Sequence, residues 1–190
     1  SALENIGVTT IEDYIRFLEM SNLIYVSNPV SVGSKAALKG KPKIYIADAA
    51  IRNAVLMVED VLSDDTEMGV MVETAVYKHI VSFYQNAASA NIGYYRKAKD
   101  NQKEVDVVID LPKGKILCEV KYRNDASIAE SDAIVALSRE DDTKVLNSFV
   151  ITKGLSDYGP VGHDTKVPVF RVPVLPFVYI LGRAEALDGG

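Results

Sequence analysis

The sequence of 190 residues has a single cysteine, Cys118, and only two histidines, His79 and His163. One cysteine excludes an internal disulfide and fits a reducing compartment. The two histidines stand alone, so their spacing suits no zinc site. No grouping of serine, cysteine and histidine is typical of nucleophilic catalysis either. These absences leave carboxylates and lysines as the side chains that would carry chemistry.

Long apolar runs and targeting signals are also absent. No stretch approaches the roughly 18 apolar residues that a membrane-spanning helix needs, and no basic segment leads into an apolar one near the N-terminus. We therefore expect a cytoplasmic protein with no membrane partner. The phosphate-binding pattern G-x-x-x-x-G-K-[ST] is missing, since the nearest stretch, residues 33–41, has the wrong spacing and is followed by Pro42. The chain itself is not expected to bind or hydrolyse ATP.

Positive charge is not in excess. Lysine and arginine total 21 against 26 aspartates and glutamates, which gives a net charge of −5 at pH 7. Proteins that bind nucleic acid by charge alone are normally basic, because phosphate contacts dominate the affinity. A local basic patch remains compatible with this balance, and an acidic metal site would itself add negative charge. The 48% of hydrophobic residues is enough for the core of a globular domain.

Residues 63–66 form an acidic, turn-forming break, and we place a domain boundary there. The part before it, residues 1–62, is expected to contain a helix, a two-stranded ribbon and a second helix. A helix followed by such a ribbon is how a winged-helix domain ends. Because the chain lacks an initiator methionine, we expect a piece of a longer protein that begins inside a winged-helix segment.

The expected elements of this first part follow from caps and apolar spacing. Thr9 or Thr10 is expected to begin the first helix, with Asp13 completing a capping box. The two strands are expected at residues 23–26 and 43–46, the first of them ended by Asn28-Pro29. Asp48 is expected to cap the second helix, at residues 49–58.

The second part, residues 63–190, is expected to be an α/β domain with a mixed sheet. Its order is αβββαβ, followed by one more strand and a short C-terminal helix. The expected elements are a helix at residues 67–85, strands at 92–97, 104–111 and 115–122, a helix at 127–138, and strands at 148–152 and 167–172.

The hairpin of residues 104–111 and 115–122 carries the candidate chemistry. Side chains alternate between the two faces of a strand, so Val105, Val107 and Ile109 point one way and Asp106 the other. Glu119 and Lys121 share a face of the second strand. A turn at residues 112–115 would set Leu111 opposite Ile116.

In that register Asp106 lies opposite Lys121, and Glu119 lies diagonally across from Asp106, about 7–8 Å away between backbone positions. Two carboxylates at this separation can share one hard cation. Glu73 is a fourth candidate, because at about 100° per residue it falls on the apolar stripe of its helix with Ile80 and Tyr84. A carboxylate placed there needs a partner, and we expect a metal or Lys121 to provide it.

An aspartate followed by Glu-x-Lys on the neighbouring strand is the minimum set for metal-dependent phosphodiester hydrolysis. Magnesium prefers oxygen ligands, usually a few carboxylates completed by water and substrate phosphate. The metal polarises the phosphate, and a nearby lysine orients the attacking water and offsets developing charge. The alternatives are a cross-strand Asp106–Lys121 ion pair, worth about 0.2–1 kcal/mol, and a structural salt bridge at Glu73.

Glu73, Glu104-Val105-Asp106 and Glu119-Val120-Lys121 resemble the signature of the PD-(D/E)XK nuclease superfamily. More narrowly, residues 8–172 resemble the C-terminal domain of unknown function in a prokaryotic family of AAA-type ATPases, where a P-loop module precedes a winged-helix segment and a nuclease-like domain. The motifs that carry this second resemblance are Gly69-x-x-x-Glu73, Tyr94-Tyr95-Arg96, residues 104–109, Cys118-Glu119-Val120-Lys121 and Tyr45-Ile46-Ala47-Asp48, which is similar to a K-x-Y-x-x-D segment of that family.

The resemblance implies a restriction-endonuclease-like core and specific roles for four residues. Asp106 and Glu119 would bind Mg²⁺ or Mn²⁺ with Glu73 in support, and Lys121 would be the catalytic lysine. ATP would be bound only by a parent ATPase module that this chain does not contain. That module would also be a partner of the domain.

Basic residues near the hairpin are candidates for nucleic-acid contact. Arg96, Lys97, Lys103 and Arg123, together with Lys99, would steer phosphates, although Asp100 and Glu104 dilute this patch. Lys41 lies with Lys35, Lys39 and Lys43 in the presumed wing, where it would touch a nucleic-acid backbone or remain simply solvated.

Two functions remain open at this point. The first is a metal-dependent endonuclease domain that acts on DNA or RNA. The second is a catalytically inactive module that recognises DNA or a protein for the attached ATPase. The acidic balance of the chain keeps the second hypothesis close to the first.

Overall fold

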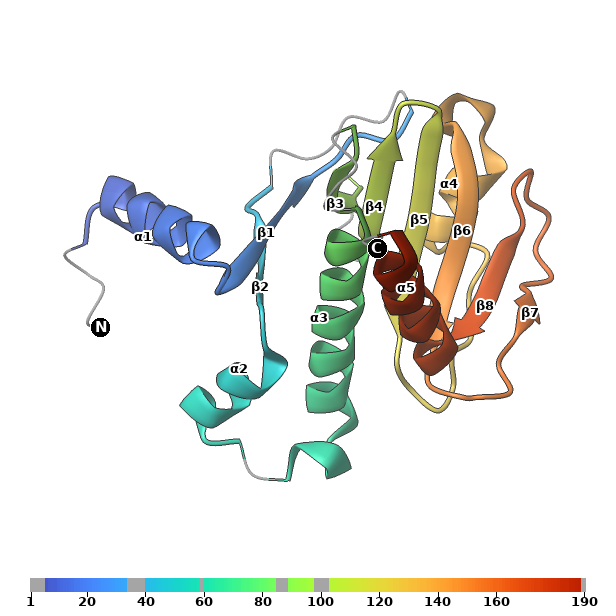
Figure 1. The fold of residues 1–190 in the computed structure, drawn as a ribbon. Helices are drawn as coiled ribbons and strands as arrows, with labels where there is room; N and C mark the ends of the chain where they lie inside the picture. Colours follow the sequence, from blue (N-terminus) through green and yellow to red (C-terminus); the bar gives the residue numbers. More distant parts are fainter. Residues whose placement is uncertain (1–5, 34–39, 59, 85–88, 98–102, 189–190) are drawn as a thin grey trace.

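The computed structural model describes residues 6–33, 40–58, 60–84, 89–97 and 103–188. This part of the chain forms one eight-stranded sheet in the order β2-β1-β3-β4-β5-β6-β8-β7, together with five α-helices (Figure 1). The strands are β1 (Ile24–Pro29), β2 (Lys43–Ile46), β3 (Asn91–Arg96), β4 (Glu104–Leu111), β5 (Gly114–Lys121), β6 (Val145–Thr152), β7 (Gly159–Pro160) and β8 (Val169–Pro173). The helices are α1 (Val8–Met20), α2 (Ala49–Leu56), α3 (Asp65–Tyr84), α4 (Ala133–Arg139) and α5 (Val174–Asp188).

The sheet is mixed, as predicted for the α/β class. β1 runs parallel to β3, and β5, β6 and β8 run parallel to one another, whereas the other neighbours are antiparallel. Helices α3 and α5 cover one face of the sheet and α4 covers the other (Figure 1). The central strands are buried on both faces and are therefore apolar in both directions. Among the described residues, no helix is long and apolar enough to cross a membrane.

Two core clusters, one on each face of the sheet, hold the layers together. The cluster under α4 includes Val105, Val108, Leu117, Ile134 and Leu137. The cluster under α3 and α5 includes Val76, Tyr77, Ile80, Val107, Ile109, Cys118 and Ile151. The charged residues of the candidate site therefore come from elements that are anchored by apolar packing.

The N-terminal ribbon β1–β2 is part of this sheet. Strand β1 continues through Asn28-Pro29, where we expected it to end, because these residues pair with Gly93 and Tyr94 of β3. A side chain at Gly93 would collide with the backbone carbonyl of Asn28, so glycine permits the close approach of the two strands. The sheet thus crosses the boundary expected at residue 62, and both that boundary and the winged-helix assignment stay predictions.

Three expected helix positions differ from the structure. Helix α1 begins at Val8 with Gly7 at its N-cap and no side-chain cap, so the capping box at Thr10 is wrong. Helix α4 begins only at Ala133, because the backbone of Asp132 just before it is extended, with φ −63° and ψ 145°. Helix α5 has 15 residues and is longer than expected.

Strands β4 and β5 pair two residues away from the expected register. Leu111 pairs with Gly114 and Ile109 with Ile116, whereas we expected Leu111 opposite Ile116. The turn is therefore only Pro112-Lys113. Gly114 is required beside it because a side chain there would collide with the carbonyl of Lys144. A shift of two residues keeps each side chain of a regular strand on its original face.

A β-bulge in β4 interrupts the regular alternation of side chains between the two faces of the sheet. The recorded pairs on its two sides are Gly93–Val108 and Tyr95–Val105. Asp106 and Val107 therefore stand together opposite one residue of β3, and the alternation breaks there. Val105 packs in the cluster under α4, whereas Val107 packs in the cluster under α3 and α5. The prediction that Val105, Val107 and Ile109 share a face is wrong for this reason.

Candidate functional site

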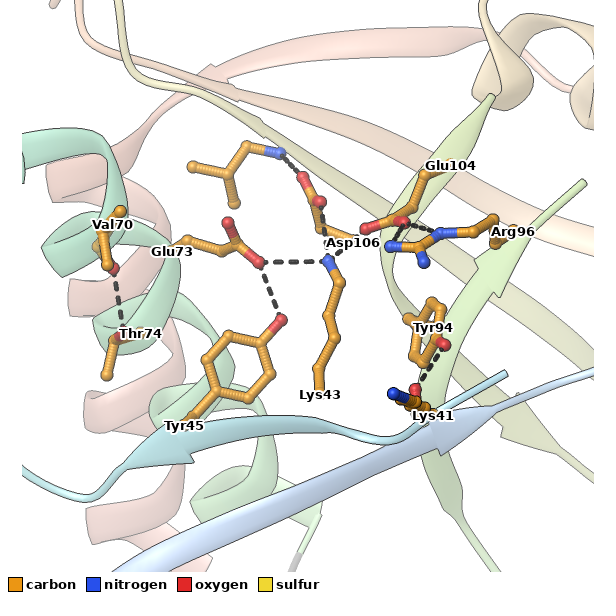
Figure 2. Close-up of polar contacts among 11 residues, drawn as sticks. Lys41, Lys43, Tyr45, Val70, Glu73, Thr74, Tyr94, Arg96, Glu104 and Asp106 are labelled. Atoms are coloured by element: carbon orange, nitrogen blue, oxygen red, sulfur yellow. Dashed lines mark hydrogen bonds and ion pairs between the residues drawn. The ribbon is translucent and has the colours of Figure 1, made fainter. Parts of the chain in front are cut away.

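Lys43 lies at the centre of the candidate site, although we expected it in the presumed wing, where it would touch a nucleic-acid backbone or remain solvated. Its Nζ is 3.3 Å from Glu73 Oε1 and 3.3 Å from Asp106 Oδ1, and it also forms an ion pair with Glu104 (Figure 2). These partners come from α3 and β4, while Lys43 comes from β2. Burial alone would lower the pKa of Lys43, but the charges of the three carboxylates raise it above its ordinary value. The side chain is therefore a fixed cation.

Tyr45 also binds Glu73. Its hydroxyl donates to Glu73 Oε1 at 2.7 Å, and its ring stacks on Tyr77 with 4.2 Å between centroids. Burial, followed by the charge of Glu73, raises the pKa of Tyr45 far above its ordinary value, so it stays a neutral donor. Glu73 does lie on the core-facing side of α3, but its protein partners are Lys43 and Tyr45. Of the two partners expected for Glu73, Lys121 bonds to Asp132 instead, and a metal ion stays a prediction.

Asp106 uses its two oxygens differently. Oδ2 accepts a hydrogen bond of 2.9 Å from the backbone N–H of Val120, and Oδ1 faces Lys43. Burial and the charge of Glu73 raise the pKa of Asp106 to about 6, against the opposing effects of Lys43 and the Val120 N–H. The bulge in β4 gives Asp106 this direction, toward β2 and α3.

Glu119 has one oxygen without a partner. Oε1 lies 3.5 Å from Lys121 Nζ, whereas Oε2 is buried and accepts no hydrogen bond from any described residue. Burial and the charge of Asp106 raise the pKa of Glu119 to about 7. A buried carboxylate oxygen without a partner is costly, and in folded proteins a bound ion or water commonly satisfies such an oxygen. A cation at this oxygen would remove the cost.

Lys121 is held on the other side of the sheet. Its Nζ donates to Asp132 Oδ2 at 2.7 Å, just before α4, and its side chain is only 13% exposed. It does not lie opposite Asp106, because the register is shifted and β4 is bulged. Asp106 thus contacts groups on the α3 side and Lys121 contacts groups on the α4 side, with Glu119 between them. The predicted convergence of all three on one face is only partly realised.

The donor set suits a hard divalent cation. Asp106 Oδ1 and Glu119 Oε2 are carboxylate oxygens from neighbouring strands, and Mg²⁺ usually takes one or two carboxylates and fills the remaining positions with water and phosphate. Within the described ranges, no three His, Cys, Asp or Glu side chains are already arranged to hold a metal. The residues fit a site of two carboxylates that water and substrate would complete.

The basic candidates lie around one end of β3 and β4 and beyond β5. Arg96 is bound to Glu104 and lies over the ring of Tyr94, 5.4 Å from its centroid, so its charge is already paired. Lys97, Arg123 and Lys41 are exposed, and the backbone of Lys97 bonds to that of Lys103. Lys35, Lys39 and Lys99 lie outside the described residues. Nucleic-acid contact by this set stays a prediction.

The predicted site residues did not include Lys43, Tyr45 and Glu104, although Tyr45 and Glu104 belong to motifs that carry the resemblance. A signal for two of them was present, because Lys43 and Tyr45 are two apart on a strand and therefore share a face. The expected cap of Asp48 on α2 is confirmed, since its carboxylate accepts from Ala50 N. Cys118 is buried in the core, as expected.

Comparisons with known proteins match two family models to this chain. The model of the family described as "Domain of unknown function (DUF4143)" matches residues 68–172, and that of "Domain of unknown function (DUF8612)" matches residues 1–62. A search of the curated proteins found no match. The first match covers more than half of the chain and contains Glu73, Asp106, Glu119 and Lys121. The chain therefore belongs to the family described as the domain of unknown function DUF4143.

Proposed function

We propose that this chain is the nuclease-like C-terminal domain of an AAA-type ATPase and carries a metal-dependent phosphodiesterase site for nucleic acid. The observation that carries the proposal is the buried, unpartnered Oε2 of Glu119 beside Asp106, with Lys121 two residues further along β5. The order α3-β3-β4-β5-α4-β6 supports a restriction-endonuclease-like core. The resemblance of these motifs to PD-(D/E)XK nucleases supplies the type of reaction.

In this proposal each residue has one task. Asp106 through Oδ1 and Glu119 through Oε2 hold Mg²⁺ or Mn²⁺, and Glu73 supports them. The bound metal supplies polarisation of the phosphate and a water of lowered pKa. The N–H of Val120 fixes the other oxygen of Asp106. Lys121, oriented by Asp132, positions the attacking water and offsets the charge that develops on the phosphate.

Calorimetric titration of Mg²⁺ and Mn²⁺ tests the metal site directly. Wild type is expected to bind, and the double variant Asp106→Ala/Glu119→Ala is expected to lose binding. Asp110→Ala is the matched control, because Asp110 is on the same strand but pairs with Lys115, away from the site. If wild type and the double variant bind these metals equally well, Asp106 and Glu119 are not the metal ligands.

Cleavage assays then test the reaction. Plasmid DNA, single-stranded DNA and RNA are incubated with wild type and Lys121→Ala in the presence of Mn²⁺. The proposal expects cleavage by wild type only. Cleavage that is equal in both proteins would show that another site, or a contaminant, is responsible.

A catalytically inactive recognition module is the second candidate, favoured by the ammonium of Lys43 among the carboxylates. An internal cation there can replace the metal structurally. If this second function is correct, DNA or a protein binds to the chain without being cleaved, in the presence or absence of metal. Gel-shift and pull-down experiments that find no partner would count against it.

A further inference from the structure

The ammonium of Lys43 occupies a position among carboxylates that a cation would otherwise take. It contacts Glu73, Asp106 and Glu104 at once, and its side chain is only 21% exposed (Figure 2). An exposed lysine of a solvated loop has no such set of partners. The β1–β2 ribbon, fixed to the sheet through β3, delivers Lys43 to this place.

Lys43 and a metal would need the same oxygen of Asp106. Oδ2 is already used by the N–H of Val120, so Oδ1 is the oxygen left for a cation, and Lys43 is on it. Lys43 also takes Oε1 of Glu73, which accepts from Tyr45 as well, so a metal bound through Glu73 would have to use its other oxygen. Lys43 and a metal ion cannot both lie on Asp106 Oδ1 without strong repulsion in a partly buried site. One must therefore give way to the other.

The side chain of Lys43 has somewhere else to go. It is a flexible four-carbon chain with a compact charged end. Its Nζ lies 5.4 Å from the centroid of the Tyr94 ring, and Glu104, which already binds Arg96, is a second anchor. Release from Asp106 would leave Lys43 beside Tyr94 and Glu104, at the edge of the site.

We propose that Lys43 is a further residue of this site, an internal counter-ion that holds Asp106 and Glu73 until a divalent cation displaces it. The proposal rests on the proposed metal-binding function. It implies that the N-terminal ribbon limits loading of the site. It also explains how three carboxylates can lie close together around one ammonium group.

The test is calorimetric titration of Mn²⁺ into wild type, Lys43→Met and the double variant Lys43→Met/Glu104→Gln. The double variant removes one charge of each sign, so the cluster keeps its net charge. Arg96→Met is the matched control, because it removes a positive charge from Glu104 but no contact with Asp106. Both Lys43 variants are expected to bind Mn²⁺ at least about tenfold more tightly than wild type, and Arg96→Met within about threefold of it.

The outcomes separate this proposal from the function on which it rests. Equal or weaker binding by the Lys43 variants, when wild type binds, overturns the counter-ion role and leaves the metal site intact. An equal gain in Arg96→Met also overturns it, because the effect would then be general charge. If none of these proteins binds Mn²⁺, with or without DNA, both the counter-ion role and the proposed function fail.

A measurement on wild type covers the case in which the variants do not fold. NMR of lysine side-chain ammonium groups follows Lys43 directly during titration with Mg²⁺. Its signal is expected to move as the metal binds, whereas that of Lys115, paired with Asp110, stays in place. An unchanged Lys43 signal at saturating Mg²⁺ overturns the proposal.

Discussion

Lys43 Nζ and Asp106 Oδ1 lie 3.3 Å apart, although the two residues are separated by 63 positions in the chain. The first belongs to the ribbon that precedes the expected domain boundary, and the second to the strand that carries the candidate chemistry. Residues on both sides of that boundary therefore build one charged site. A functional study of the second part alone would remove both Lys43 and Tyr45 from the site.

Tyr45→Phe is expected to lower the free energy of unfolding by about 1.5–3 kcal/mol, because it removes a hydrogen bond to the charged Glu73 inside a largely buried cluster. Urea denaturation measures the change. Tyr158→Phe is the control, since the Tyr158 side chain is exposed and the same hydroxyl is removed there. An effect of equal size at both positions would mean that the bond to Glu73 contributes nothing specific.

Glu119→Gln is expected to stabilise the metal-free chain at pH 8 but not at pH 5. The pKa of Glu119 is raised to about 7 in the folded state, from an ordinary value near 4.5, so the native protein holds this proton more tightly. The protonated Glu119 therefore contributes fully to the stability of the folded state below about pH 4.5, and this contribution is lost as the pH rises through about 7. Wild type thus loses about 1–3 kcal/mol relative to the variant between these limits.

Urea denaturation of both proteins at pH 5 and pH 8 checks this dependence on Glu119. Glu130→Gln, on the exposed surface, provides the comparison. Added Mn²⁺ should stabilise wild type at pH 8 more than Glu119→Gln, because only wild type retains the charged ligand. If the difference in free energy of unfolding between Glu119→Gln and wild type is the same at pH 5 and at pH 8, the raised pKa of Glu119 is contradicted.

Gly93→Ala is expected to be strongly destabilising, by about 2 kcal/mol or more, because the added methyl group meets the backbone carbonyl of Asn28 and forces β1 away from β3. Gly69→Ala is the matched control in α3, where nothing lies within 4 Å of the new methyl group. That change should stabilise the helix by about 0.5–1 kcal/mol. Thermal unfolding measures both changes. An equal decrease in Tm for the two variants would refute the role of the β1–β3 contact.

Lys121→Met is expected to reduce cleavage at least about 100-fold while Mn²⁺ binding persists, because the lysine acts on the water and the developing charge and is not a ligand. Single-turnover cleavage of DNA and calorimetry together measure the two effects. Lys153→Met, which breaks an exposed ion pair with Asp65, should leave both unchanged. Loss of metal binding in Lys121→Met would show instead that Lys121 maintains the position of Glu119.

Local patterns in the sequence were sufficient for much of the fold. The bounds of β2 and β4 are those expected, and Asp48 caps α2 as predicted. The start of α4 at Ala133 was not predicted, and the bond of the preceding Asp132 to Lys121 of a distant strand is a contact that no local pattern reports. The continuation of β1 through Pro29 depends in the same way on its partner in β3.

The candidate site was predicted by residue type but not by its contacts. Glu73, Asp106, Glu119 and Lys121 were selected because charged residues stood at informative spacings in otherwise apolar elements. The spacing of Lys43 and Tyr45 in β2 shows that they share a face, but the residues that this face meets depend on how the ribbon joins the sheet. The bulge at Asp106 depends on a mismatch between two strands, so neither strand alone predicts it.

The bulge in β4 also makes the number of residues between Val105 and Val108 part of the site. Deleting Val107 would restore regular pairing with β3 and leave Asp106 on the face of α3 and α5, but it would remove the apolar side chain that packs beside it on that face. Deleting Asp106 would also restore regular pairing, but it would remove the acid. The extra residue of β4 therefore lets one face hold both the acid and its apolar neighbour, and relatives of this chain with one residue fewer between Val105 and Val108 would keep only one of the two.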